Sequence, residues 1–261
     1  FLHMRNQHIL TIDSKACIKC GMCIKDCVIN NLQMGKDSAV PKKNTCLACG
    51  HCVAVCPKNA VSLSGFEDTP LPVLSPVPFS GSDLVQLIRQ RRSIRQFQNR
   101  AVSQELIEQL LTAGQYTPTA SNSQNVSYLV LRENIASYEQ TAIHTLRRLK
   151  KIQSIFSHSW DDFSIDEHFL FKKAPLVMII KSPDIVNASL AAASIELTAN
   201  AFGLGVLYSG FFSLAAAHSH KLRKMLSLSS RKESVLALVI GYPAVRYQRT
   251  AQKEHPAISY D

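Results

Sequence analysis

All eight cysteines of the chain lie between residues 17 and 56, where they form two copies of one pattern. Each copy reads Cys-x2-Cys-Gly-x-Cys-x3-Cys. Thiolates that are separated by two residues on a tight loop can reach neighbouring corners of a small metal cluster, so this spacing indicates iron–sulfur chemistry. The cysteines of the first copy are Cys17, Cys20, Cys23 and Cys27, and those of the second copy are Cys46, Cys49, Cys52 and Cys56.

Zinc binding and disulfide bonding are two other uses of closely spaced cysteines. Structural zinc sites commonly join two Cys-x2-Cys pairs across a long gap, whereas here a third cysteine follows each pair after only two residues. Disulfide frameworks are typical of secreted proteins, and we find no segment with the basic start and short apolar core of a signal peptide. We therefore expect iron–sulfur clusters and a location in the reducing cytoplasm.

Residues 8–64 resemble the dicluster bacterial ferredoxins, on the strength of these two runs and of Pro57, which follows the second run. The first run has Val28 at the corresponding position. In such ferredoxins three cysteines of a run hold one 4Fe-4S cluster, and the fourth ligates the other cluster. The resemblance therefore implies that one cluster is held by Cys17, Cys20, Cys23 and Cys56, and its twin by Cys46, Cys49, Cys52 and Cys27.

The length and the proline content predict a small domain followed by a larger one. The 261 residues exceed what a ferredoxin needs, and the short apolar strands expected beside the cysteine runs form little core, so the clusters must contribute to folding. The stretch from Glu67 to Ser80 has four prolines and no apolar periodicity, which is typical of a semi-rigid linker. We expect a ferredoxin domain, a linker and a second domain at residues 1–66, 67–80 and 81–261.

Net charge and hydropathy bear on two other classes of partner. Cluster ligation lowers the formal charge of +10 to about +6, which favours acidic redox partners and leaves nucleic-acid binding as a minor alternative. The apolar stretch from Ala188 to Ala217 invites a transmembrane interpretation. However, it contains Glu196 and Asn200, and a carboxylate near the centre of a spanning helix is costly. We expect a buried helix of a dimer core, no membrane span and no nucleic-acid partner.

A second group of residues with chemical potential begins at Arg89, where four arginines occur within seven residues. They follow a helix that Ser82 or Asp83 is expected to cap. Such a cluster can be a solvated face or a patch for polyanions. Guanidinium groups and a hydroxyl at alternating positions can also surround one phosphate with bidentate donors.

The order of segments after the arginines decides between these interpretations. An amphipathic helix starts at Ser103 and is expected to end near Gly114, followed by the polar loop Gln115–Gln124 and a strand at 127–131. The order Arg-Arg-Ser-x-Arg, helix, Pro-Thr-Ala-x-Asn-x-Gln, strand resembles the FMN-dependent nitroreductase family. The resemblance continues through a strand at 176–181, a long helix at 187–205 and a strand at 235–240, and so spans roughly residues 81–261. Where many relatives have Pro-Trp after the glutamine, this chain has Asn125 and Val126.

The nitroreductase resemblance implies an α+β protein whose second domain is an α/β/α sandwich that binds FMN at the interface of a homodimer. It places Arg91, Ser93 and Arg95, with Arg92 adjacent, at the phosphate, ribityl chain and pyrimidine edge of FMN. It brings Arg246 and Arg249 to the phosphate and the backbone of Ser209 and Gly210 to the flavin N5. From the other subunit it supplies the loop residues Pro118, Thr119, Ala120, Asn122 and Gln124.

The mixed, aromatic segment 151–173 often lies over the flavin in this family, although it reads equally well as a surface helix and loop. Neither His158 nor Trp160 is therefore assigned a catalytic role, and we find no side-chain acid or base that must act in catalysis. The remaining histidines lack the spacing of metal ligands.

The fusion predicts an oxidoreductase in which electrons from ferredoxin or another low-potential donor pass through two clusters to FMN and on to an organic acceptor. Nitroaromatic compounds and quinones are the classes of acceptor that the resemblance implies. One alternative makes NAD(P)H the donor and the clusters an outlet. Another is an electron carrier or redox sensor without a dedicated substrate.

Overall fold

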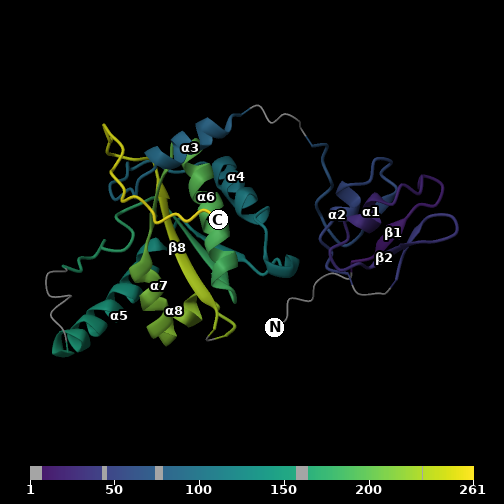
Figure 1. Cartoon of the computed structure of the whole chain (residues 1–261). Coiled ribbons are helices and arrows are strands. Elements are labelled where there is room, and N and C mark those ends of the chain that lie inside the picture. Colours follow the sequence, from purple (N-terminus) through teal and green to yellow (C-terminus); the bar gives the residue numbers. More distant parts are fainter. Residues whose placement is uncertain (1–7, 43–45, 74–78, 157–163, 231) are drawn as a thin grey trace. The chain divides into compact units, whose positions relative to one another are not determined.

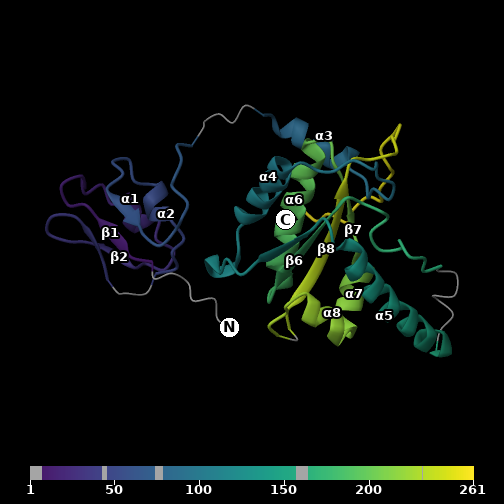
Figure 2. The ribbon, with the colours of Figure 1, turned by 180° about the vertical axis from the view of Figure 1, so that it is seen from behind.

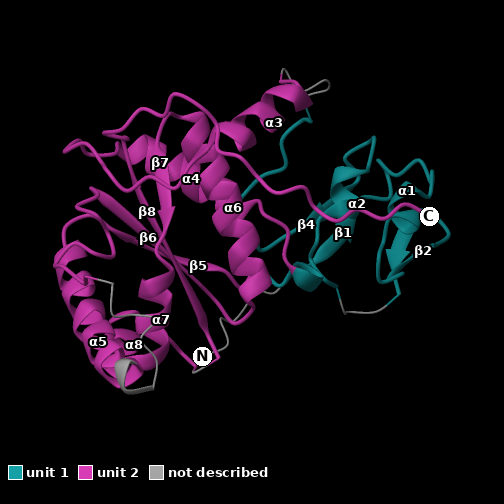
Figure 3. Ribbon diagram, turned by 60° about the vertical axis from the view of Figure 1, so that its left-hand side comes forward, with its two compact units in different colours: residues 1–77, 120–123 teal, residues 78–119, 124–261 magenta. Residues whose placement is uncertain are grey.

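The computed structural model describes residues 8–42, 46–73, 79–156, 164–230 and 232–261. The chain divides into two compact units (Figure 3): residues 1–77 with 120–123, and residues 78–119 with 124–261. The division falls inside the stretch 67–80 expected as a linker. The expected domain boundaries themselves stay a prediction.

Unit 1 is built from two short antiparallel strand pairs and two single-turn helices (Figure 1). Strand β1 (Leu10–Ile12) pairs antiparallel with β4 (Val61–Leu63), so the strands expected on either side of the cysteine runs lie next to each other. Strands β2 (Leu32–Met34) and β3 (Ala39–Pro41) form the second pair. Helices α1 (Met22–Lys25) and α2 (His51–Ala54) each follow a glycine of a cysteine run.

The internal repeat of the sequence is also a repeat of backbone conformation. Gly21 and Gly50 have φ angles of 76° and 75°, in the left-handed region where a Cβ is unfavourable. Lys19 and Ala48, at matching positions, have φ angles of 58° and 52°. The two cysteine loops therefore repeat the same backbone conformation at these positions.

Unit 2 has a four-stranded antiparallel sheet in the order β5-β6-β8-β7. Its strands are β5 (Ser127–Leu131), β6 (Leu176–Ser182), β7 (Gly205–Tyr208) and β8 (Ser234–Gly241). Its helices are α3 (Gly81–Gln90), α4 (Gln104–Gln115), α5 (Ile135–Phe156), α6 (Ile185–Ala201), α7 (Gly210–His218) and α8 (His220–Met225). The short 3-10 turn η1 (Ala120–Asn122), which follows α4 in the chain, belongs to unit 1.

Helices cover both faces of this sheet, which gives the predicted α/β/α sandwich. Along β6, Leu176, Met178 and Ile180 pack into one core with α4 and α6. The alternate residues Val177 and Ile179 pack into a second core with α5, α7 and α8. Figures 1 and 2 show these two helical layers on opposite sides of the strands. Strand β6 reads as a continuous apolar run because it is buried on both faces.

Local expectations for two helices need correction. The helix expected at 187–205 is α6, which ends at Ala201, and Gly205 instead begins strand β7. The cap of α3 is Ser80, whose hydroxyl accepts from the backbone N–H of Asp83, so neither Ser82 nor Asp83 is the cap. Asp83 instead completes a capping box from the third helical position. Helix α4 is capped by Ser103 as predicted, and it continues one residue past Gly114.

In the described part of the chain, no helix is both long enough and apolar enough to span a membrane.

Candidate cofactor sites

The eight cysteines line two separate cavities of unit 1. Each cavity takes three thiols from one run and the fourth thiol from the other run. The structure thus brings together the two sets that the ferredoxin resemblance implied, although ligation itself stays a prediction. The first cavity is lined by Cys17, Cys20, Cys23 and Cys56, and the second by Cys46, Cys49, Cys52 and Cys27.

Backbone N–H groups point at three of the sulfur atoms. The N–H of Asn31 donates to Cys27 Sγ at 3.2 Å, and that of Ala60 donates to Cys56 Sγ at 3.2 Å. Ala48 donates to its neighbour Cys46 Sγ at 3.3 Å. Hydrogen bonds of this kind fix the orientation of the three cysteine side chains relative to the loops that carry them.

Four thiols around one cavity are the donor set that an iron–sulfur cluster uses. Among the described residues, which include every cysteine, no group of three or more His, Cys, Asp or Glu side chains is placed to hold a single metal ion. Four thiols nevertheless surround each cavity. A tetrahedral zinc site draws its ligands to a point, whereas a 4Fe-4S cluster spreads them around a larger body.

Burial disfavours the ionised form of the buried thiol in each run. Burial, together with the nearby thiols Cys46 and Cys49, raises the pKa of Cys52 to about 11. Burial likewise raises the pKa of Cys23 in the first run. Iron in the cavity would offset both effects, because metal ligation replaces the thiol proton.

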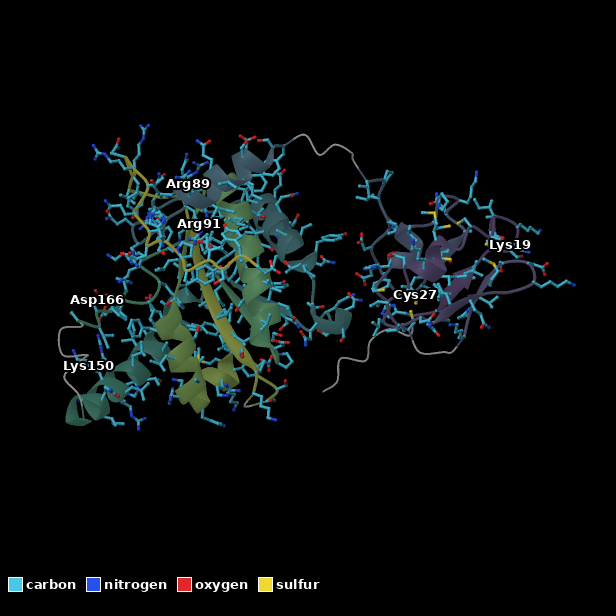
Figure 4. All side chains as sticks on the ribbon, in the orientation of Figure 1. Lys19, Cys27, Arg89, Arg91, Lys150 and Asp166 are labelled. Carbon is cyan, nitrogen blue, oxygen red and sulfur yellow. The ribbon has the colours of Figure 1, made fainter. Side chains whose placement is uncertain are left out.

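A cavity of about 530 Å³ in unit 2 brings together the two arginine motifs of the sequence. Arg91 and Arg92 reach it from the end of α3, and Arg246 and Arg249 reach it from the segment after β8. Figure 4 labels Arg91 in this unit. Four guanidinium groups around one cavity provide the bidentate donors and the positive charge that a phosphate requires.

Main-chain pairing holds the two arginine motifs beside each other. Ile94 N donates to the carbonyl of Val206 at 3.0 Å, which attaches the first motif to the start of β7. A few residues later, Gln98 N donates to the carbonyl of Tyr242 at 2.8 Å, just before the second motif. In addition, the guanidinium of Arg100 lies 3.8 Å from the ring centre of Tyr242. The cavity is thus built on paired backbone.

Gly205 allows the first motif to approach the sheet closely. A Cβ at this position would lie 2.4 Å from Ile94 Cγ1 and 3.0 Å from Pro243 Cγ. Ile94 is buried, with only 5% of its surface exposed, whereas its neighbour Arg95 is exposed. Glycine at 205 therefore determines how deep the Arg-Arg-Ser-Ile-Arg segment sits.

The other predicted flavin contacts lie at several places in the chain. Ser93 forms a bridge with Val206. Arg95 Nη1 donates to the Ser93 carbonyl at 3.4 Å and does not line the arginine cavity. Ser209 is buried, and its N–H donates to the carbonyl of Ala237 at 2.9 Å, where β7 ends and α7 begins at Gly210.

The loop expected to serve a neighbouring subunit is divided between the two units. Of its five predicted residues, the three described ones that belong to unit 2, namely Pro118, Thr119 and Gln124, do not line the arginine cavity. Thr119 Oγ1 accepts from the N–H of Gln124 at 2.9 Å. Residues 120–123 belong to unit 1, where Asn122 donates to the carbonyls of Leu47 and Ala48 at 3.1 and 3.0 Å. The five residues are Pro118, Thr119, Ala120, Asn122 and Gln124.

Sequence reasoning missed one feature of this site, the carboxylate of Glu196. Arg91 Nη1 donates to Glu196 Oε1 at 3.0 Å, and the hydroxyl of Tyr208 hydrogen-bonds to the same carboxylate. Burial raises the pKa of Glu196, although Arg91 acts against this shift. A lone acidic residue within an apolar helix was the available signal, but the sequence does not indicate its partner.

His158 and Trp160, to which no catalytic role was assigned, lie outside the described residues.

Sequence comparison places both units in known families. The model of the nitroreductase family matches residues 88–242, more than half of the chain. The chain belongs to the nitroreductase family. The model of the 4Fe-4S dicluster domain matches residues 9–61, a range that contains all eight cysteines. The predicted fusion and the predicted fold class are thereby confirmed.

Two relatives are similar in sequence to this chain over about two thirds of its length. A protein of Methanothermobacter thermautotrophicus, whose name pairs NADH dehydrogenase with NAD(P)H nitroreductase, is 26% identical over 174 residues, which cover 63% of this chain and 80% of that protein. An Archaeoglobus fulgidus protein with the same name is 23% identical over 170 residues, covering 62% of this chain and 86% of that protein.

Solved structures show the same nitroreductase fold. The FMN-dependent nitroreductase of Clostridium difficile R20291 superposes with a TM-score of 0.55 at 18% identity, covering 69% of this chain and all (100%) of that one. A nitroreductase of Desulfitobacterium hafniense DCB-2, solved with bound FMN, also has a TM-score of 0.55, at 17% identity, covering 68% and 98%. At this identity the likeness establishes the fold of unit 2.

Proposed function

We propose that this nitroreductase-family chain is an iron–sulfur flavoprotein oxidoreductase. It carries electrons from a low-potential donor through two 4Fe-4S clusters to FMN and on to an organic acceptor. The observation that carries the proposal is that one chain provides both two four-thiol cavities and an arginine-lined cavity in a nitroreductase fold. Cluster ligation would fall to the eight cysteines in the two sets that line these cavities.

The arginine cavity fits the phosphate end of FMN. Arg91, Arg92, Arg246 and Arg249 would bind the phosphate. Ser93, which bridges to β7, and Arg95 would meet the ribityl chain and the pyrimidine edge. The backbone at Ser209 and Gly210 would face N5. FMN would accept electrons singly and release them as a hydride. The residues of the chain orient the cofactor, balance its charge and limit which acceptors reach it.

A homodimer would complete the flavin site. Residues 118–124 of one subunit would line the flavin of the other, as the relationship to nitroreductases suggests. Helix α6 also has large apolar side chains that are 44% to 60% exposed in the single chain, namely Ile185, Val186, Leu190 and, just past its end, Phe202. A second copy would cover such a surface. Sedimentation should give a dimer, and a flavin-loaded monomer would contradict this part of the proposal.

The donor and acceptor follow from the chemistry of the two kinds of cofactor. Clusters transfer one electron at a time, so a ferredoxin or a similar low-potential protein is the donor that uses them. A nitroaromatic compound, a quinone or a similar acceptor would take two electrons from the flavin together with protons from water. We place the protein in the cytoplasm, where thiols stay reduced.

The names of the archaeal relatives favour a second candidate function. Both names include NADH and NAD(P)H, so the flavin of this chain could instead receive a hydride from a nicotinamide, with the clusters as an electron outlet. The two candidates share the fold and the cofactors and differ in the site of electron entry.

The cofactor content tests the proposal itself. Protein purified without oxygen should contain about eight irons and eight sulfides per chain, with one FMN. Stoichiometric zinc without sulfide would contradict the cluster assignment. Full cluster content without any flavin, after reconstitution with FMN, would contradict the flavin assignment and leave an electron carrier or redox sensor.

A further inference from the structure

Glu196 is a buried acid in a helix whose other buried side chains, apart from Asn187, are alanine and isoleucine. It lies in the last half of α6, with 6% of its surface exposed, near Ile195 and Ala199, which are fully buried. A charged group in such a place is costly unless it is paired. A methionine or leucine would fill the same volume without this cost, so packing does not explain a carboxylate here.

The two partners of Glu196 come from segments far apart in the sequence. Arg91 follows the last turn of α3, and Tyr208 ends β7 immediately before Ser209. Arg91 Nη1 donates to Glu196 Oε1 at 3.0 Å, and the hydroxyl of Tyr208 donates to the same carboxylate. The side chain of Arg91 is 38% exposed, whereas that of Glu196 is 7% exposed. The pair therefore has one buried end and one open end.

The open end faces the arginine cavity. In the ion pair of Arg91 and Glu196, Arg91 is among the described residues that line the cavity, whereas Glu196 is not. The guanidinium thus lies at the cavity with the carboxylate behind it. One of its N–H groups is used by Glu196, and the remaining donors of the fork stay available for a ligand. An arginine held in this way loses less side-chain freedom when it binds an anion.

We infer that Glu196 is a positioning residue, which holds the Arg91 guanidinium at the cavity for the phosphate of a flavin nucleotide and is itself oriented by the Tyr208 hydroxyl. The inference rests on the proposed function, since it concerns the same cavity. Glu196 touches Arg91 rather than the ligand, and its negative charge is balanced by the guanidinium that it holds. Loss of the carboxylate should therefore weaken binding of the phosphate.

Binding titrations of the full-length, flavin-free protein with FMN and with riboflavin test the inference. Quenching of flavin fluorescence gives each Kd without any turnover. Glu196→Met should raise the Kd for FMN about tenfold, as loss of a supporting partner commonly does. It should change the Kd for riboflavin, which lacks the phosphate, by less than twofold. Glu196→Gln, which still accepts from Arg91, should restore most of the FMN affinity.

A double variant separates positioning from a general loss of structure. In the Arg91→Ala background, Glu196→Met should produce no further loss of FMN affinity, because the residue that it positions is gone. In the protein that keeps Arg91, Tyr208→Phe should reduce the affinity for FMN by less than Glu196→Met does. Glu105→Gln, which removes an exposed carboxylate from α4, is the control and should leave both Kd values unchanged.

Several outcomes would overturn the inference. These are an FMN Kd for Glu196→Met within twofold of the parent, an equal loss for riboflavin, an equal loss in the Arg91→Ala background, and a failure of both Glu196→Met and Glu196→Gln to fold. A parent protein that binds no FMN would instead reject the proposed function. The failure of the inference and that of the function are therefore distinguishable.

Discussion

Single residues decide whether the arginine cavity holds a phosphate, and Arg91 is the most informative of them. Arg91→Ala should weaken FMN binding by about 1.5 to 3 kcal/mol, the contribution of one hydrogen bond to a charged group. Cluster absorbance should remain, because the cysteines lie in the other unit. The difference in binding free energy is obtained by separating free FMN from the protein by ultrafiltration and measuring its fluorescence.

Arg89→Ala provides the matched control for this prediction. Arg89 is exposed in the last turn of α3, two residues before Arg91, and it does not line the cavity (Figure 4). If both variants lose flavin equally, the effect is one of general charge, and the assignment of Arg91 fails.

Glu139 gives a prediction about pH. Its carboxylate is buried and accepts from the N–H groups of Leu170 and Phe171 at 3.1 and 2.7 Å. Burial raises its pKa above the ordinary 4.5, and those hydrogen bonds, with His168 nearby, only partly oppose the shift. The folded state therefore binds the Glu139 proton more tightly than the unfolded state does. This contribution to stability is present below the unfolded pKa and is lost as the pH rises through the folded pKa.

Glu139→Gln removes the carboxyl group whose ionisation lowers stability as the pH rises. The amide oxygen of glutamine can still accept hydrogen bonds from the backbone. Its melting temperature should therefore rise relative to that of the parent as the pH increases from about 4.5 to neutrality. Thermal melts across this range, with Glu105→Gln as the control, check the trend. A difference that stays constant with pH would contradict the raised pKa of Glu139.

At the residue scale, the cysteine and arginine sites could be predicted from the sequence. The cysteine runs and the arginines carry their chemistry in residue type and spacing, and the structure gathers them in cavities. The pairing of Glu196 with Arg91 and Tyr208 could not be predicted in this way. It depends on which face of α6 meets α3 and β7, and a helix that is apolar on all sides gives no sign of its orientation.

At the scale of elements, the seating of the first arginine motif against β7 determines the shape of the cavity. Gly205→Ala would place a Cβ 2.4 Å from Ile94 Cγ1, so the motif must move outward. Overpacking of this kind costs about 1 to 3 kcal/mol. We expect a lower melting temperature together with weaker FMN binding, measured on the same protein.

Gly81→Ala is the control for this substitution, because a Cβ at Gly81 meets no atom within 4 Å. It should leave the affinity for FMN unchanged. If Gly205→Ala lowers the melting temperature but retains the parental affinity, the seating of Ile94 does not position the arginines.

Local sequence signals explain how much of each element could be predicted. The helix capped by Ser103 and the apolar strands β6 and β8 lie within two residues of their expected ends. The cap of α3 was placed wrongly because Ser80, Ser82 and Asp83 are all good capping residues, and only the backbone selects among them. The strand order also depends on long-range pairing that no local pattern contains.

At the scale of the whole molecule, the order of motifs identified both parts of the fusion, while the acceptor stayed unknown. Acceptor choice depends on the walls over the flavin, and in the proposed dimer part of those walls comes from a second subunit. In this chain Asn125 replaces the proline common in relatives. Its side-chain oxygen accepts from Ser182 and Asn187 at 3.1 and 3.0 Å, in hydrogen bonds that are partly buried.

The function of the fusion leads to a prediction about the clusters. If electrons reach the flavin through them, Cys17→Ser with Cys46→Ser, which removes one expected ligand from each set, should abolish turnover driven by reduced ferredoxin. The flavin should remain reducible by a small chemical donor, since the proposed cluster ligands and the proposed flavin site lie in different units. Ferredoxin-driven rates that are equal with and without clusters would reject the relay.

The most direct test of the account is anaerobic stopped-flow reduction of the bound flavin, followed at its absorbance band with each donor in turn. The fusion of one-electron centres to a nitroreductase fold predicts rapid reduction by reduced ferredoxin and slow reduction by NADH or NADPH. Rapid reduction by a nicotinamide, with slow or absent reduction by ferredoxin, would contradict electron entry through the clusters and would establish the alternative function.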